Sequence, residues 1–118
     1  LTWMHATKAD FTTTWAELER VVPTEWAERW RARLARQPQS TEEVTWLRRE
    51  NCPVVIPRNH RVEEALAAAE AGDFGVMARL LEALAAPYDY DRARAVDMAE
   101  YRVPAPDGGE GYRTYCGT

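Results

Sequence analysis

The spacing of apolar residues constrains the fold of this chain most, because it repeats the period of an α-helix along nearly the whole sequence. In the stretch ADFTTTWAELERVV, the residues Phe11, Trp15, Leu18 and Val22 follow one another at intervals of four, three and four. These intervals place them on one face of a helix. The alternation typical of strands is almost absent, so the sequence predicts an all-α fold.

Start and stop signals divide this pattern into short helices. Asp10 and Asn59 are expected N-caps, and Ser40 with Glu43 has the spacing of a capping box. Pro53 and Pro57 break helicity, and an extended, buried connector is favoured over a short strand between them. We expect five or six short helices and then an irregular tail, with the helices near 10–22, 24–37, 41–50, 60–71, 74–85 and 91–101 and the tail over 102–118.

The sequence AEAGDF gives the clearest local prediction. Gly72 can adopt the left-handed conformation that ends a helix, and Asp73 can cap the helix that follows immediately. The segments on either side both carry apolar residues at helical spacing. We therefore expect an antiparallel helical hairpin at this point.

Size and composition limit the class of protein. The 118 residues fit one domain or a piece of a larger protein, and we treat 1–118 as a single helical region. A net charge of −4 argues against binding to nucleic acid, which needs a basic surface.

No apolar run is long enough to cross a membrane, and the first residues resemble no signal peptide. The absence of a starting Met suggests that the natural chain begins elsewhere. Two cysteines are too few for a secreted disulfide scaffold, so a cytoplasmic protein is expected.

The residues that could bind a metal or a phosphate lack the required spacing. His5, His60, Cys52 and Cys116 include no closely spaced pair of the kind that structural zinc sites use. The glycines of DGGEGY have no following helix and are better explained as a turn. We therefore assign no metal site, cofactor site or catalytic residue to this chain.

Two groups of aromatic residues are candidates for docking to another surface. Trp26 and Trp30 lie one turn apart on an expected helix and could form either a docking face or part of an internal core. Tyr112 and Tyr115 could hold the tail against a neighbouring surface. From the residues alone, we interpret the thiol of Cys116, which follows Tyr115 directly, as incidental.

Three segments occur in an order that resembles a known family. IPRNHRVEEALAAAEAGDF, LLEALAAPYDYD and YRTYCGT resemble the C-terminal region of the selenoprotein O (SelO/YdiU) family. MHATKADFTTTWAEL is similar to the segment that follows the kinase-like core of that family. The resemblance therefore extends over nearly the whole chain.

This resemblance implies a parent enzyme with a kinase-like fold. Such an enzyme would use ATP with Mg²⁺ or Mn²⁺ to transfer AMP to Ser, Thr or Tyr hydroxyls of protein substrates. The present chain would pack on that kinase-like core without supplying a catalytic residue. Lys8 has no plausible strand context, and the Asp-Phe-Gly at 73–75 has no catalytic loop before it.

The resemblance also suggests a role for the terminal thiol. Cys116 matches by position a residue of the family that is selenocysteine in animal members and is thought to pair with a cysteine of the core. Cys52 stands where relatives often have Asn, so a Cys52–Cys116 bond within this chain is also possible.

Two other functions remain open at this point. The chain could be a free-standing helical module that binds a partner through an apolar face, or a small zinc or redox protein that uses both cysteines. An uncovered apolar patch larger than monomers usually expose would favour a piece of a larger fold.

Overall fold

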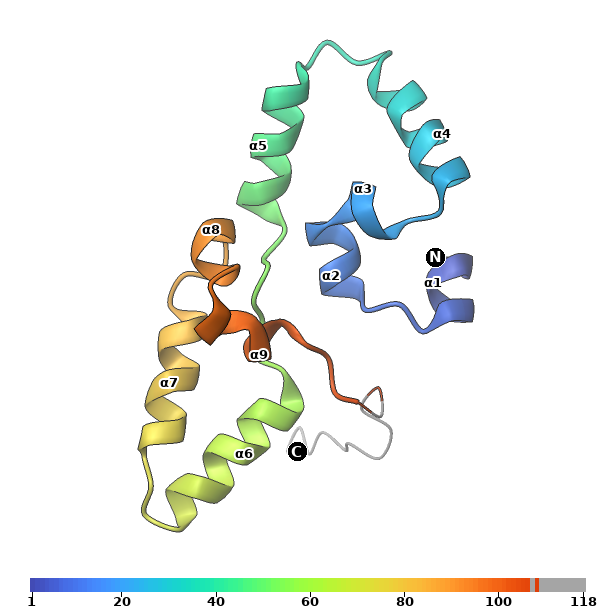
Figure 1. Ribbon diagram of the computed structural model, residues 1–118. Coiled ribbons are helices and arrows are strands. Elements are labelled where there is room, and N and C mark those ends of the chain that lie inside the picture. The colour runs from blue at the N-terminus through green and yellow to red at the C-terminus, as the bar shows by residue number, and fades with distance from the viewer. Residues whose placement is uncertain (107, 109–118) are drawn as a thin grey trace, which may run out of the picture.

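A computed structural model describes residues 1–106 and 108 of the chain. Within these residues the regular structure is entirely helical, which confirms the all-α prediction. The molecule is elongated, with principal extents of 55 × 32 × 30 Å. Figure 1 shows a helical hairpin at one end and an arm formed by α4 and α5 at the other. The elements are α1 (Thr2–Thr7), α2 (Phe11–Ala16), α3 (Leu18–Val21), α4 (Thr24–Leu34), α5 (Thr41–Asn51), α6 (Asn59–Glu70), α7 (Gly75–Leu84), α8 (Tyr90–Ala93), a 3₁₀ turn (Val96–Met98) and α9 (Ala99–Arg102).

The described residues form more and shorter helices than the periodicity predicted. The helix expected over 10–22 is interrupted at Glu17, whose φ and ψ of −118° and 35° are not helical. The helix expected over 91–101 is interrupted at Ala95, which is extended at φ −60° and ψ 148° and separates α8 from the 3₁₀ turn and α9. The helix α1 was not expected, since Leu1 before it supplies no capping side chain.

Most of the expected helix boundaries lie close to the observed ones. Asp10 caps α2 as predicted, and its carboxylate accepts a hydrogen bond from the Thr13 N–H at 2.8 Å. Ser40 and Glu43 form the expected capping box at the start of α5. The predicted cap at Asn59 was wrong by one residue, because Arg58 is the N-cap of α6 and makes no side-chain capping bond. The helix expected to reach residue 37 ends at Leu34.

The hairpin between α6 and α7 forms as predicted, and these two helices make the most extensive helix–helix contact in the described residues. Gly72 in the turn has a φ of +90°, a conformation that residues with a side chain rarely adopt. The predicted cap at Asp73 was wrong by one residue, because Phe74 is the N-cap of α7 and makes no side-chain capping bond. The Asp73 carboxylate still accepts a hydrogen bond from the Gly75 N–H at 2.8 Å. Local sequence signals were sufficient to specify this turn.

The core lies where the hairpin meets the connector between α5 and α6. Val54 and Val55 of this connector are buried, and both backbone N–H groups donate to the carbonyl of Pro87. The connector is therefore extended and buried, as the flanking prolines suggested. The buried apolar cluster contains Ala16, Val54, Val55, Ala65, Leu80, Ala83, Tyr90, Ala93, Met98 and Tyr101.

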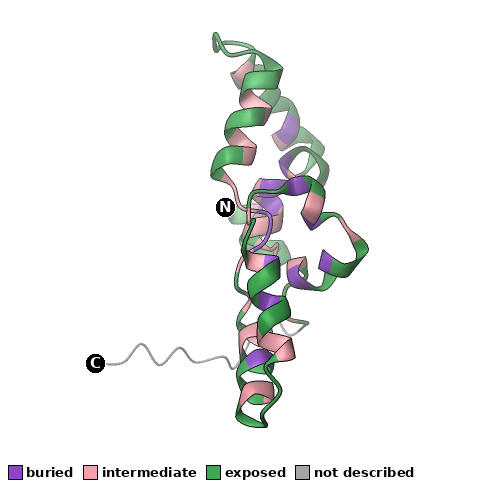
Figure 2. Cartoon of the chain, turned by 90° about the vertical axis from the view of Figure 1, so that its left-hand side faces the viewer, coloured by how far each residue is buried: buried purple, intermediate pink, exposed green. Residues whose placement is uncertain are grey.

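This core is modest for the size of the molecule. No large side chain among the described residues is completely buried, and α5 buries none of its residues. Figure 2 shows buried residues mainly in the middle of the molecule and along the hairpin. From α1 to α4, only Ala16 belongs to the central cluster. No helix in the described part of the chain is long and apolar enough to cross a membrane.

Candidate functional site

An apolar groove of about 450 Å³ lies among α1, α2, α3 and α4. Its lining contains no charged side chain, and the larger residues in it are Trp3, Met4, Phe11, Trp15, Leu18, Val22 and Trp26. Leu1 lies at the same groove. None of the residues that line the groove belongs to the central buried cluster.

Two aromatic side chains of α2, Phe11 and Trp15, line the groove. The ring centroids of Phe11 and Trp15 lie 6.0 Å apart at an interplanar angle of 59°. Phe11 leaves 61% of its surface exposed. The indole Nε1 of Trp15 is buried and has no hydrogen-bond acceptor. The indole N–H can only donate, so Trp15 has a buried donor without a partner among the described residues.

The two tryptophans that were candidates for a docking face or an internal core line two different hollows. Trp26 and Trp30 stack on each other, with ring centroids 6.4 Å apart and an interplanar angle of 17°. Trp26 lines the apolar groove, whereas Trp30 lines a second hollow between α4 and α5 together with Leu34 and Val44. Both tryptophans are partly exposed.

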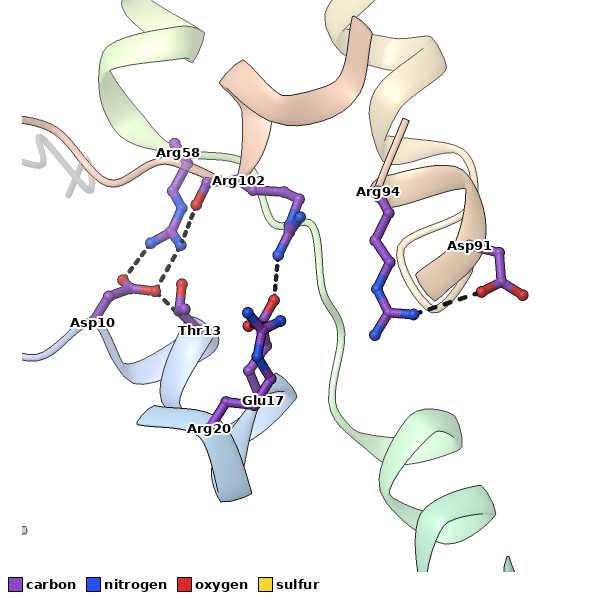
Figure 3. A network of polar contacts seen from close by, with 8 residues as sticks. All are labelled: Asp10, Thr13, Glu17, Arg20, Arg58, Asp91, Arg94 and Arg102. Carbon is purple, nitrogen blue, oxygen red and sulfur yellow. Dashed lines mark hydrogen bonds and ion pairs between the residues drawn. The ribbon is translucent and has the colours of Figure 1, made fainter. Parts of the chain in front are cut away.

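A network of ion pairs joins the groove helices to the rest of the molecule (Figure 3). The Arg58 guanidinium donates to both carboxylate oxygens of Asp10, at 2.6 and 2.8 Å, and to the carbonyl of Arg102 at 3.2 Å. The Arg102 side chain in turn pairs with Glu17, which also contacts Arg20 at 3.1 Å. The network therefore ties α2 to the connector and to α9, where the irregular tail begins.

Burial and pairing act in opposite directions on the pKa of Asp10. Burial raises it, but hydrogen bonds from Arg58 and Thr13 outweigh that effect and lower the pKa from 3.8 to about 2. The side chains of Arg58 and Asp10 are only 10% and 18% exposed. The pair is thus a largely desolvated contact, whose loss costs more than the loss of a surface ion pair.

Of the two cysteines, only Cys52 lies within the described residues, where it is a half-buried free thiol at the end of α5. Its carbonyl accepts a hydrogen bond from the Tyr90 hydroxyl at 2.7 Å. Burial raises the pKa of that hydroxyl, and the Arg49 guanidinium lies over the Tyr90 ring at 5.2 Å. The predicted positions Cys116, Tyr112 and Tyr115 lie outside the residues that the structure describes.

No three His, Cys, Asp or Glu side chains gather into a potential metal site within residues 1–106 and 108. His5 is exposed, and His60 is half-buried in the first turn of α6. Lys8 follows α1 in the left-handed conformation, at φ 51°, rather than lying on a strand. The Asp-Phe-Gly sequence forms the end of the hairpin turn and the start of α7. Neither feature has the surroundings of a nucleotide site.

Sequence comparison identifies close relatives. The chain is 50% identical over 95 residues to "Protein nucleotidyltransferase YdiU" of Bacillus mycoides (strain KBAB4), a match that covers 80% of this chain. It is 42% identical to the YdiU protein of Brevibacillus brevis and 45% identical to that of Syntrophotalea carbinolica, and each of these matches covers the whole chain. The chain belongs to the SelO/YdiU family.

The chain spans only 19 to 26% of the length of these SelO/YdiU relatives. The matches are consistent with the C-terminal region of the family, as the sequence resemblance predicted. No family model matches the chain, and no solved structure matches it.

Sequence reasoning identified part of this site. The expected helical face of Phe11, Trp15 and Val22 was the signal for one wall of the groove. Trp3 and Met4 were missed because α1 was not predicted. The ion pairs were missed as well, because Asp10 and Arg58 are 48 positions apart and no local pattern relates them.

Proposed function

We propose that this chain is the helical C-terminal region of a SelO-type protein adenylyltransferase that acts in the cytoplasm. The region packs on the kinase-like core of its parent protein and contributes no catalytic residue. The observation that carries the proposal is the identity of 42 to 50% to proteins named protein nucleotidyltransferase, of whose length this chain spans 19 to 26%. The modest core and the open groove support it, because both are expected of a piece of a larger fold.

In this proposal the parent transfers AMP from ATP to a Ser, Thr or Tyr hydroxyl of a protein substrate. The hydroxyl oxygen attacks the α-phosphorus, a new P–O bond forms, and pyrophosphate leaves while the hydroxyl proton passes to a base or to solvent. ATP and Mg²⁺ or Mn²⁺ would be bound by the remainder of the parent. No three His, Cys, Asp or Glu side chains gather into a potential metal site among the described residues.

An experiment with ATP labelled at different phosphates tests this function. The full-length parent is incubated with protein substrates and ATP that is labelled either at the α-phosphate or at the γ-phosphate. AMP transfer puts only the α-label on protein, because the γ-label leaves with pyrophosphate. Incorporation of the γ-label would indicate phosphoryl transfer instead. Incorporation of neither label would favour the alternative of a helical protein-interaction module.

The proposal assigns Cys116 a regulatory redox role, with Cys52 or a cysteine of the parent's core as its partner. Cys116→Ser in the full-length parent should remove the dependence of AMP transfer on reductant and leave the fold unchanged. Cys52→Ser, compared in parallel, tests whether the partner lies within this chain. Equal activity with and without reductant in the unmodified parent would contradict the redox role.

A further inference from the structure

The apolar groove among α1, α2, α3 and α4 is incomplete as it stands. Phe11 is 61% exposed beside Trp15 and Trp26, and the groove lining has no charged side chain. A single exposed apolar residue is ordinary, but a concave cluster of aromatic residues typically marks an interaction site.

We propose that this groove docks a segment of the parent protein that precedes Leu1 in the same polypeptide. This inference rests on the proposed function. Two of the relatives extend over roughly three quarters of their length beyond the part that matches this chain. Leu1 itself lines the groove, so polypeptide joined to it would enter the molecule at this site. Such a covalently attached segment has a high effective concentration at the groove.

The groove also defines the chemistry of the segment that fits it. Apolar side chains are required, because a charged group placed against this lining would lose its hydration without gaining an ionic partner. An amphipathic segment with an apolar, uncharged face meets this condition.

The groove is firmly connected to the rest of the described structure. Asp10 lies next to Phe11, and its bidentate pair with Arg58 holds the start of α2 against the connector. Glu17, at the other end of α2, pairs with Arg102. A segment docked against α2 is therefore also held in place relative to α9 and to the beginning of the tail.

Photocrosslinking in the full-length parent tests the proposal. Phe11 is replaced by p-benzoylphenylalanine, and a second probe replaces Met4 on the α1 side of the groove. The matched control places the same probe at Trp46, which is 59% exposed on α5 and lies outside the groove. Because Phe11 and Trp46 are both largely exposed, neither substitution should disturb the fold, and circular dichroism checks this.

Both groove probes should crosslink to residues before Leu1 in the same molecule, with a yield several-fold above that of the control. Mixing isotopically light and heavy copies separates intramolecular from intermolecular products in the mass spectrum. Crosslinks between copies, crosslinks confined to residues 1–118, or no crosslinks would each overturn the proposal. AMP transfer by the unmodified parent is measured separately. Transfer without groove crosslinks refutes the docking alone, whereas crosslinks without transfer refute the proposed function and leave the docking intact.

Discussion

The Asp10–Arg58 pair provides the sharpest test of how this molecule is held together. Asp10→Asn removes the charge but keeps a side-chain oxygen that can cap α2, since Asn is as good an N-cap as Asp. The decrease in the pKa of Asp10 from 3.8 to about 2 corresponds to about 2 kcal/mol of stabilisation. The Arg58 side chain is only 10% exposed and would be left without its carboxylate. The total loss should therefore be at least about 2 kcal/mol, and up to about 4 kcal/mol.

The assay is urea unfolding followed by tryptophan fluorescence, at pH 7 and at a series of lower pH values. The folded-state pKa of Asp10 lies below its unfolded value, so its stabilisation is complete above about pH 4 and is lost as the pH falls toward 2. The difference between wild type and Asp10→Asn should accordingly shrink over the same range. Asp91→Asn is the matched control, because Asp91 is 84% exposed and lies 3.9 Å from Arg94. That variant should lose less than about 1 kcal/mol.

Two results would refute this reasoning about Asp10. One is a loss within about 0.5 kcal/mol of the Asp91→Asn control at pH 7, which would make the pair no stronger than a surface contact. The other is a difference between wild type and Asp10→Asn that stays constant from pH 7 to pH 2. In that case the stabilisation would not come from the ionised carboxylate.

Three further substitutions test the local structure by the same unfolding measurement. Leu80→Ala should lower the free energy of unfolding by about 2 to 5 kcal/mol, because Leu80 is only 4% exposed. Leu81→Ala is the control and should lower it much less, since Leu81 is 59% exposed. Equal losses in the two variants would contradict the assigned core. Ser40→Ala removes half of the capping box with Glu43 and should cost about 1 kcal/mol, and an unchanged midpoint would argue against that cap. Gly72→Ala should lower the free energy of unfolding by about 1 kcal/mol, because a residue with a side chain is strained at a φ of +90°. The added Cβ would not clash, since no atom lies within 4 Å of its position. A stabilised variant would contradict the left-handed turn.

The parts of the fold that were predictable depend on interactions between residues close in sequence. The capping box joins residues three positions apart, and the hairpin turn depends on Gly72 and its neighbours. Each signal acts within one or two helical turns, so it survives in any tertiary setting. The finer breaks at Glu17 and Ala95 were not predictable, because apolar periodicity continues across both positions.

By itself, the sequence determined the helical class, the hairpin, the buried connector and membership of the SelO/YdiU family. Only the tertiary structure decided which charges pair and which apolar faces remain open. The chain has 15 Lys and Arg and 19 Asp and Glu, and composition cannot select Arg58 for Asp10 or Arg102 for Glu17 from among them. The groove likewise needs α1, α2 and α4 side by side, and Trp26 faces it while Trp30 does not. These choices depend on distances across the folded molecule, which local periodicity does not encode.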